Sequence, residues 1–161
     1  MAVQATFDWL GSTAAGQYLA ASTPAFAAVQ SIHLLALAAL GGAVFITDLA
    51  SLRLIFRSSA PGEIARGIFP IFVAALLGMI VSGTLLVAAG PTKYLLNPLF
   101  GPKLAALAVA VAIHLGLQKL ELRNAVGADG AQAVAATRTL AVLSIIAWLV
   151  VAVIGRWVGL I

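Results

Sequence analysis

The sequence contains no cysteine, and only 9% of its residues are charged. The absence of cysteine excludes disulfides, thiolate metal sites and cysteine nucleophiles. The charged fraction is far below the roughly 25% that soluble domains use. The chain also lacks a Walker loop, a GxSxG elbow and an HExxH signature, so nucleotide and hydrolase chemistry have no support. A redox function would therefore need a bound cofactor.

What the chain has in abundance is apolar residues: 63% are hydrophobic, and the mean hydropathy is +1.12. This composition indicates an all-α integral membrane protein whose main surroundings are the lipid bilayer. At about 20 to 25 residues for each spanning helix, the 161 residues accommodate four helices with short connections and no separate soluble domain. The prediction is a single membrane domain, residues 1–161, folded as a four-helix bundle.

Breaks in the apolar pattern set the predicted boundaries. Residues 1–23 have no basic n-region and no continuous apolar core, so they do not read as a cleaved signal peptide. They form either a short amphipathic helix in the membrane interface or a loosely ordered terminus. Pro24 suits a first helical turn. The transmembrane helices are predicted at residues 24–56, 64–89, 101–122 and 137–158.

The basic residues favour one orientation in the membrane. Six of the nine flank the first and third connections between helices, and the other three flank the second connection and the C-terminus. The positive-inside rule then places both termini on the periplasmic side of a bacterial inner membrane. This placement accounts for the net charge of +4 without a nucleic-acid partner.

Two of the predicted helices carry a histidine inside an apolar run. On the first, His33, Gly41 and Asp48 fall on one face when each residue advances by about 100°. On the third, Lys103 and His114 also share a face, because eleven residues make about three helical turns. Ionisable groups at membrane depth are functional candidates by default. The polar faces of these two helices are therefore predicted to point towards each other across the bundle interior.

The sharpest interpretation is that the two histidines, His33 and His114, ligate a haem b. A neutral imidazole binds iron without bringing a charge into lipid. Gly41, on the same face as His33, would leave room for the flat macrocycle. Lys103 or Arg156, both near the outer surface, would pair with a haem propionate.

The depths of the two histidines argue against one haem held between both. His33 lies about 14 Å from Pro24, whereas His114 lies about 18 to 20 Å from the start of its helix. Met79 is then an alternative axial ligand. In the alternative without a cofactor, His33 bonds a Ser or Thr and His114 bonds Gln118 or a carbonyl, and both only fix the helix packing.

Asp48 is the second candidate for chemistry. Near the cytoplasmic end of the first helix, it either pairs with a nearby cation or serves a proton relay or a quinone head group. The candidate cations are Arg53, Arg66 and Lys119. Three other carboxylates are expected in solvated connections: Glu63, Glu121 and Asp129.

Three segments carry a resemblance to a known family: HLLALAALGGAVFITDLASLRL, SGTLLVAAGPTKYLLNPLFGPKL and AWLVVAVIGRWVGL. Together they resemble a widespread family of small four-helix bacterial inner-membrane proteins of unknown function. The resemblance covers most of the chain. The matching positions are His33, Gly41, Asp48, Leu49, Gly83, Asn97, Phe100, Lys103, Gly155, Arg156 and Trp157.

A weaker likeness rests on His33 followed by glycine and on Lys103 opening a helix with His114 downstream. This pattern is similar to haem-binding protoporphyrinogen oxidases of the HemJ kind and to CopD-type copper-resistance membrane domains. The likeness implies a haem or a copper ion, with His33 and Lys103 as the residues carried over. The chain lacks the further motifs of the oxidases, so enzymatic activity stays open. Copper is disfavoured, because two methionines and no cysteine offer few soft ligands.

Three hypotheses of different classes follow. The first is a cytochrome-like electron carrier that holds haem b and exchanges electrons with quinone or another redox protein. The second is an accessory membrane subunit without a cofactor, which self-associates as a homo-oligomer through small-residue helix faces. The third is a protein for proton or small-solute permeation through the bundle interior, using Asp48, His114 and Lys103.

Overall fold

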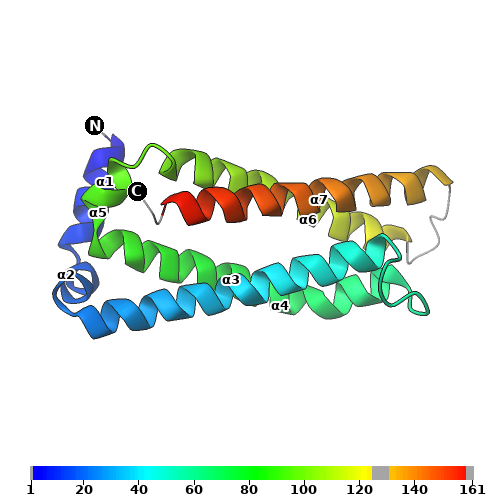
Figure 1. Cartoon of the computed structure of the whole chain (residues 1–161), viewed down its shortest axis with the longest axis horizontal. Helices are drawn as coiled ribbons and strands as arrows, with labels where there is room; N and C mark the ends of the chain where they lie inside the picture. Colours follow the sequence, from blue (N-terminus) through cyan, green and yellow to red (C-terminus); the bar gives the residue numbers. More distant parts are fainter. Residues whose placement is uncertain (1, 125–130, 159–161) are drawn as a thin grey trace.

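The computed structural model describes residues 2–124 and 131–158, and within these residues it contains helices and no strand (Figure 1). Four helices are long and apolar enough to cross a membrane. They are α3 (Thr23–Ser51), α4 (Pro61–Ala89), α6 (Phe100–Asn124) and α7 (Ala131–Val158). The predicted all-α, multi-pass membrane bundle is therefore confirmed.

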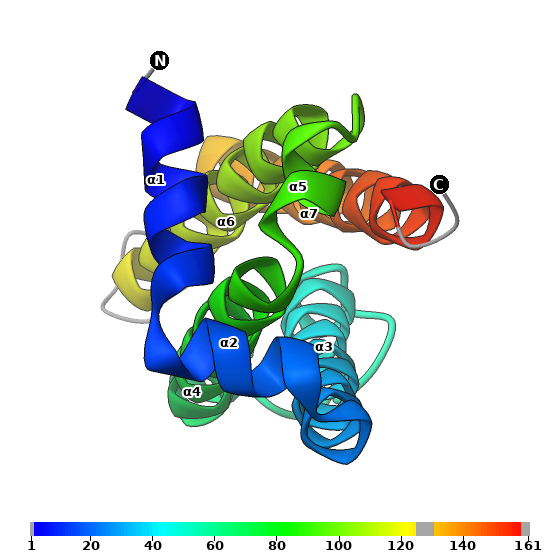
Figure 2. The ribbon, with the colours of Figure 1, turned by 90° about the vertical axis from the view of Figure 1, so that its left-hand side faces the viewer.

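Three short helices gather at one end of the bundle, which we call the α1 end (Figures 1 and 2). They are α1 (Ala2–Ser12), α2 (Ala14–Ala21) and α5 (Pro91–Leu95). Thr13 separates the first two and caps α2, because its Oγ1 accepts a hydrogen bond from the Gly16 amide at 3.1 Å. Phe7 of α1 packs edge-on against Phe100, with ring centroids 5.9 Å apart. We call the opposite end, where α3 leads to α4, the loop end.

Several boundaries differ from the predicted ones. α3 ends at Ser51 and not at residue 56, because Arg53 takes a left-handed φ of 60° and its Nη1 donates to the Ser59 carbonyl oxygen at 2.9 Å. α7 begins at Ala131, well before residue 137, since the alanine-rich stretch there favours helix. The connection predicted at residues 90–98 contains α5. Asp129 lies in the segment 125–130, outside the described residues.

The four long helices enclose one apolar core. α3 packs on α4 and α7, and α6 packs on the same two helices, so α3 and α6 lie diagonally across the bundle. α3 and α4 approach closely at Gly78, where an added Cβ would lie 3.4 Å from the Ala36 methyl. The buried core includes Leu40, Val44, Phe72, Met79, Ala110 and Trp148. A polar side chain inside this core is removed from water and needs a partner there.

Candidate functional site

His33 is held by a hydrogen bond between α3 and α4. Its Nδ1 lies 2.8 Å from Ser82 Oγ. The one hydroxyl hydrogen of Ser82 goes to the Gly78 carbonyl oxygen at 2.5 Å, so the imidazole is the donor and Nδ1 carries the proton. Nε2 then keeps its lone pair, which is the form in which histidine ligates metals. The serine or threonine partner that the alternative without a cofactor predicts for His33 is present.

Gly83 allows the His33 ring to lie directly against the α4 backbone. A Cβ added at Gly83 would come within 3.3 Å of His33 Cε1, which is tighter than ordinary van der Waals contact. Ser82 and Gly83 therefore act together: one fixes the ring nitrogen and the other leaves space for the ring. The sequence analysis did not identify Ser82 as this partner, because only the packing of α3 on α4 brings the two side chains together.

A cavity of about 320 Å³ lies beside His33 at the α1 end. Its volume is at the lower end of the range for small-molecule sites. Its rim includes the exposed side chains of Ile80, Thr84 and Leu104, so it opens between α4 and α6 on the outside of the bundle. The remaining lining is mostly apolar and aromatic: Phe7, Leu10, Met79, Leu86, Val87, Tyr94, Phe100 and Leu107, together with Lys103.

Lys103 is the cation of this cavity. Lys103 lies in the first turn of α6 and is partly buried. Its aliphatic side chain lies close to α7, because a Cβ added at Gly155 would be 3.7 Å from Lys103 Cε. Within the part of the chain that the structure describes, the one ion pair joins Asp48 and His114, so Lys103 has no carboxylate partner there. An ammonium in this position is ready to pair with an anionic group of a ligand.

Not all of the predicted haem residues share the cavity. His33, Met79 and Lys103 line it together. Gly41 does not line it, and a Cβ added at Gly41 would meet nothing within 4 Å. Arg156 is exposed on α7 and is also absent from the cavity wall.

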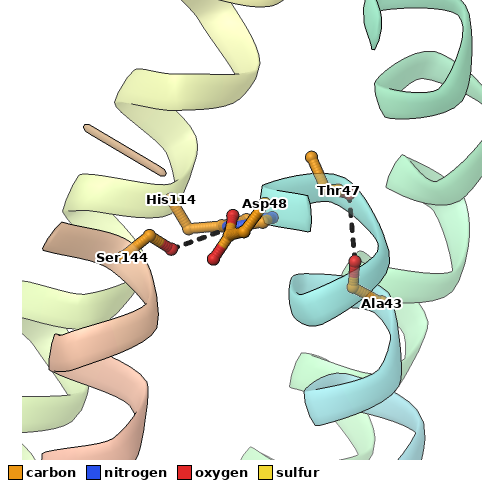
Figure 3. Close-up of polar contacts among 5 residues, drawn as sticks. All are labelled: Ala43, Thr47, Asp48, His114 and Ser144. Atoms are coloured by element: carbon orange, nitrogen blue, oxygen red, sulfur yellow. Dashed lines mark hydrogen bonds and ion pairs between the residues drawn. The ribbon is translucent and has the colours of Figure 1, made fainter. Parts of the chain in front are cut away.

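Asp48 and His114 form a second polar site, joining the diagonal pair α3 and α6 (Figure 3). Asp48 Oδ1 lies 3.3 Å from His114 Nδ1, and both side chains have 0% exposure. Ser144 Oγ of α7 lies 3.4 Å from the same nitrogen. Phe72 of α4 stacks on the imidazole with ring centroids 4.5 Å apart. All four long helices thus contribute to this site.

These contacts correct two expectations. Asp48 pairs with His114 and not with Arg53, Arg66 or Lys119, because those three cations are exposed at the loop end. His114 contacts Asp48 and Ser144 instead of Gln118 or a carbonyl oxygen. The prediction that the polar faces of the first and third spanning helices meet is confirmed by this contact.

The two histidines belong to separate sites. His33 and Asp48 are fifteen residues apart on one helix, which corresponds to about 22 Å along the axis. His114 lies at the level of Asp48, so its ring is far from His33 in depth. The two cannot serve as opposite ligands of one iron in this packing, because axial nitrogens on one iron lie within a few ångströms of each other.

Buried polar side chains continue from His114 towards the loop end. Gln118 and Glu121 follow it on the same face of α6, and they are 3% and 4% exposed. Glu121 was expected in a solvated connection, but α6 continues to Asn124 and keeps this carboxylate inside the bundle. Its spacing of seven residues from His114 was the available signal. Ser51 of α3 is buried at the same end.

We call the buried polar side chains of Gln118, Ser51 and Glu121 the polar column. It ends at a second cavity of about 320 Å³ at the loop end. Ser51 and Glu121 line it from inside the bundle. Its outer lining includes Asn124, Thr137, Arg53 and Arg138. Asn124 Nδ2 donates to Thr137 Oγ1 at 3.0 Å, which joins α6 to α7 beside the opening.

No cluster of three or more His, Asp or Glu side chains that could hold a metal ion occurs among residues 2–124 and 131–158. A metal bound there by protein ligands alone would lack the coordination that zinc or copper sites require. A metal that brings its own macrocycle needs only one or two axial ligands. The site at His33 is compatible with a metal that is held in a macrocycle.

The sequence model of a family described as "Family of unknown function (DUF6644)" matches residues 2–161. No curated protein and no solved structure matches the chain.

Proposed function

The chain belongs to this family of unknown function, and we propose that it is a haem b-binding membrane protein that carries electrons as a cytochrome does. The observation that carries the proposal is His33, whose Nδ1 lies 2.8 Å from Ser82 Oγ and whose side chain lines a cavity. Metal-ligating histidines commonly have their second ring nitrogen fixed in this way. His33 would be the axial ligand.

The rest of the cavity supports the same ligand. Its apolar and aromatic lining suits a porphyrin, and Lys103 would pair with a propionate. Burial raises the pKa of the Tyr94 phenol, so this side chain stays a neutral hydrogen-bond donor at the cavity wall. The opening between α4 and α6 gives a ligand larger than the cavity room to extend towards lipid.

A haem at this site supplies reversible one-electron chemistry, and the protein supplies its ligand, its charge partner and its apolar surroundings. Met79, buried in the same wall, would offer its thioether as a further ligand for the iron. Quinone in the bilayer is the expected exchange partner, because the cavity opens sideways between the spanning helices. Another redox protein would have to approach at the α1 end.

We place the protein in a bacterial inner membrane with both termini on the periplasmic side. Arg53 and Arg57 lie exposed at the loop end, as the positive-inside rule requires of a cytoplasmic connection. The haem would then lie near the periplasmic surface. In that position it is accessible both to quinone and to a periplasmic donor.

The test is the visible spectrum of the protein purified from cells supplied with haem precursor. We expect a red protein with about one haem per chain, a Soret band, and α and β bands that sharpen on reduction by dithionite. A fully folded, colourless protein that does not take up added hemin would contradict the proposal. That result would favour a cofactor-free accessory subunit.

A further inference from the structure

The pair of Asp48 and His114 is not needed for a haem at His33, yet it is the most deeply buried ionisable site that the structure describes. Both side chains are inaccessible, and the contact between Asp48 Oδ1 and His114 Nδ1 at 3.3 Å is not aligned as a hydrogen bond. No described residue hydrogen-bonds either Asp48 oxygen or His114 Nε2. A purely structural ion pair at this depth would have these atoms satisfied.

Most of the other buried polar atoms without a partner lie towards the loop end; Trp148 Nε1, on the α1 side of the pair, is the exception among the described residues. Among the described residues, neither side-chain amide atom of Gln118 has a hydrogen-bond partner. The Ser51 hydroxyl lies beside the Glu121 carboxylate, but Ser51 Oγ and Glu121 Oε1 are not aligned as a hydrogen bond with any described residue. Gln118 and Glu121 lie about 6 and 10 Å from His114 along α6, towards the loop end. Ser51 and Glu121 line the cavity at that end. Polar groups that are buried without a protein partner are typically satisfied by water.

The opposite direction is mostly apolar, and the indole of Trp148 there belongs to the hydrophobic core. Ala110, one turn from His114 towards the α1 end, is 0% exposed and belongs to the hydrophobic core. Leu40 and Val44 of α3 are also 0% exposed, and they occupy the two turns on the α1 side of Asp48. The unpartnered polar side chains therefore lead from the pair towards the loop end, whereas the core separates the pair from the cavity at His33.

We propose that Asp48 and His114 form an intramembrane proton-binding site that exchanges protons with the aqueous phase at the loop end, through the column of Gln118, Ser51 and Glu121. The proton comes from hydronium, which leaves a water molecule behind. It forms an O–H bond on Asp48 or an N–H bond on His114, and on release it returns to water by the same route. The pair thus changes between net charges of −1 and 0.

Charged groups from every neighbouring element bear on this exchange. Glu121 of α6 lies between the pair and the loop-end cavity, and Arg53 and Arg138 line the outer part of that cavity from the α3 end and from α7. α4 presents Phe72 to the pair, and its own ionisable residues Glu63 and Arg66 are exposed. The two arginines therefore place positive charge at the mouth of that cavity, beyond Glu121.

The first test uses the absence of cysteine from the chain. Gln118→Cys and Ala110→Cys place single thiols four residues to either side of His114, at positions that are 3% and 0% exposed. A small, membrane-impermeant thiol reagent reacts only where water supports thiolate formation. With the reagent on the loop-end side, we expect Gln118→Cys to react at least about tenfold faster than Ala110→Cys. Equal, slow reaction at both positions, or reaction from the α1 side, would overturn the proposal.

The second test follows the proton itself. The chain has two histidines, so histidine-selective ¹⁵N NMR gives two ring systems, and the spectrum of His33→Gln assigns them. The His114 signals should shift with pH in the wild-type protein. They should stay neutral throughout in Asp48→Asn and titrate as in the wild type in Glu63→Gln, which removes an exposed carboxylate. His114 signals that do not respond to pH in the wild type would identify a fixed structural pair.

Discussion

His33 Nδ1 lies 2.8 Å from Ser82 Oγ, and the hydroxyl of Ser82 is committed to the Gly78 carbonyl oxygen. This arrangement assigns the proton of a neutral imidazole to Nδ1 and leaves Nε2 as an acceptor. Because the ring also lies against Gly83, its position is fixed as well as its tautomer. The proposed haem therefore depends on His33 and not on His114.

Ser82→Ala should weaken haem binding without abolishing it. Losing a hydrogen-bond partner of a metal-ligating histidine typically costs about 10- to 100-fold in affinity. Titration of the haem-free protein with hemin measures the effect. Ser31→Ala is the matched control, since Ser31 is exposed and bonds only the Ala27 carbonyl oxygen of its own helix. Equal haem affinity in both variants would show that the hydrogen bond between Ser82 and His33 does not contribute to haem binding.

Lys103→Gln should reduce haem affinity by about tenfold, because a charge-assisted hydrogen bond contributes about 1.5 to 3 kcal/mol and glutamine retains part of it. Lys93→Gln, at an exposed position on α5 outside this cavity, should leave the affinity unchanged. The same hemin titration gives both values. If the two substitutions had the same effect, the role of Lys103 would be only that of general surface charge.

Met79→Leu should leave haem in place and lower its reduction potential, since leucine conserves volume while the thioether ligand is lost. Redox titration followed in the visible spectrum measures the shift. A potential and spectrum identical to those of the wild type would show that Met79 only lines the wall.

His114→Leu should destabilise the bundle by about 3 to 5 kcal/mol, because it leaves the Asp48 carboxylate buried without a partner. The double variant Asp48→Leu/His114→Leu should recover most of this loss, since no charge is left unpaired. Unfolding by denaturant in detergent micelles compares the three proteins. A double variant as unstable as the single one would mean that packing around Phe72, and not charge, dominates the cost.

The sequence predicted the four spanning helices because their length and apolar composition leave no other fold in a bilayer. It also predicted that the polar faces holding Asp48 and His114 meet. It did not predict their direct pairing, because lysine and arginine are the usual partners of a carboxylate near a helix end, whereas the Asp48 partner is a histidine of another helix. The start of α7 was missed, since the boundary was set by the glycines and polar residues of the preceding connection.

Glu121 and Ser144 were missed for different physical reasons. Glu121 stands among basic and polar residues near a helix end, and such a carboxylate is usually solvated; its burial depends on how α3 and α7 pack around it. Ser144 is one hydroxyl in an apolar helix, and only the tertiary arrangement brings it within 3.4 Å of His114 Nδ1. The helix rise of about 1.5 Å per residue did predict that the two histidines lie at different depths in the membrane.

If His33 holds the haem and His114 does not, the matched variants His33→Gln and His114→Gln differ in their visible spectra. Glutamine preserves side-chain hydrogen bonding at both positions but does not replace an imidazole as an iron ligand. The dithionite-reduced spectrum should disappear in His33→Gln and persist at wild-type intensity in His114→Gln. A spectrum that persists in His33→Gln, or that is lost in a folded His114→Gln, would show that His33 is not the residue that holds the haem.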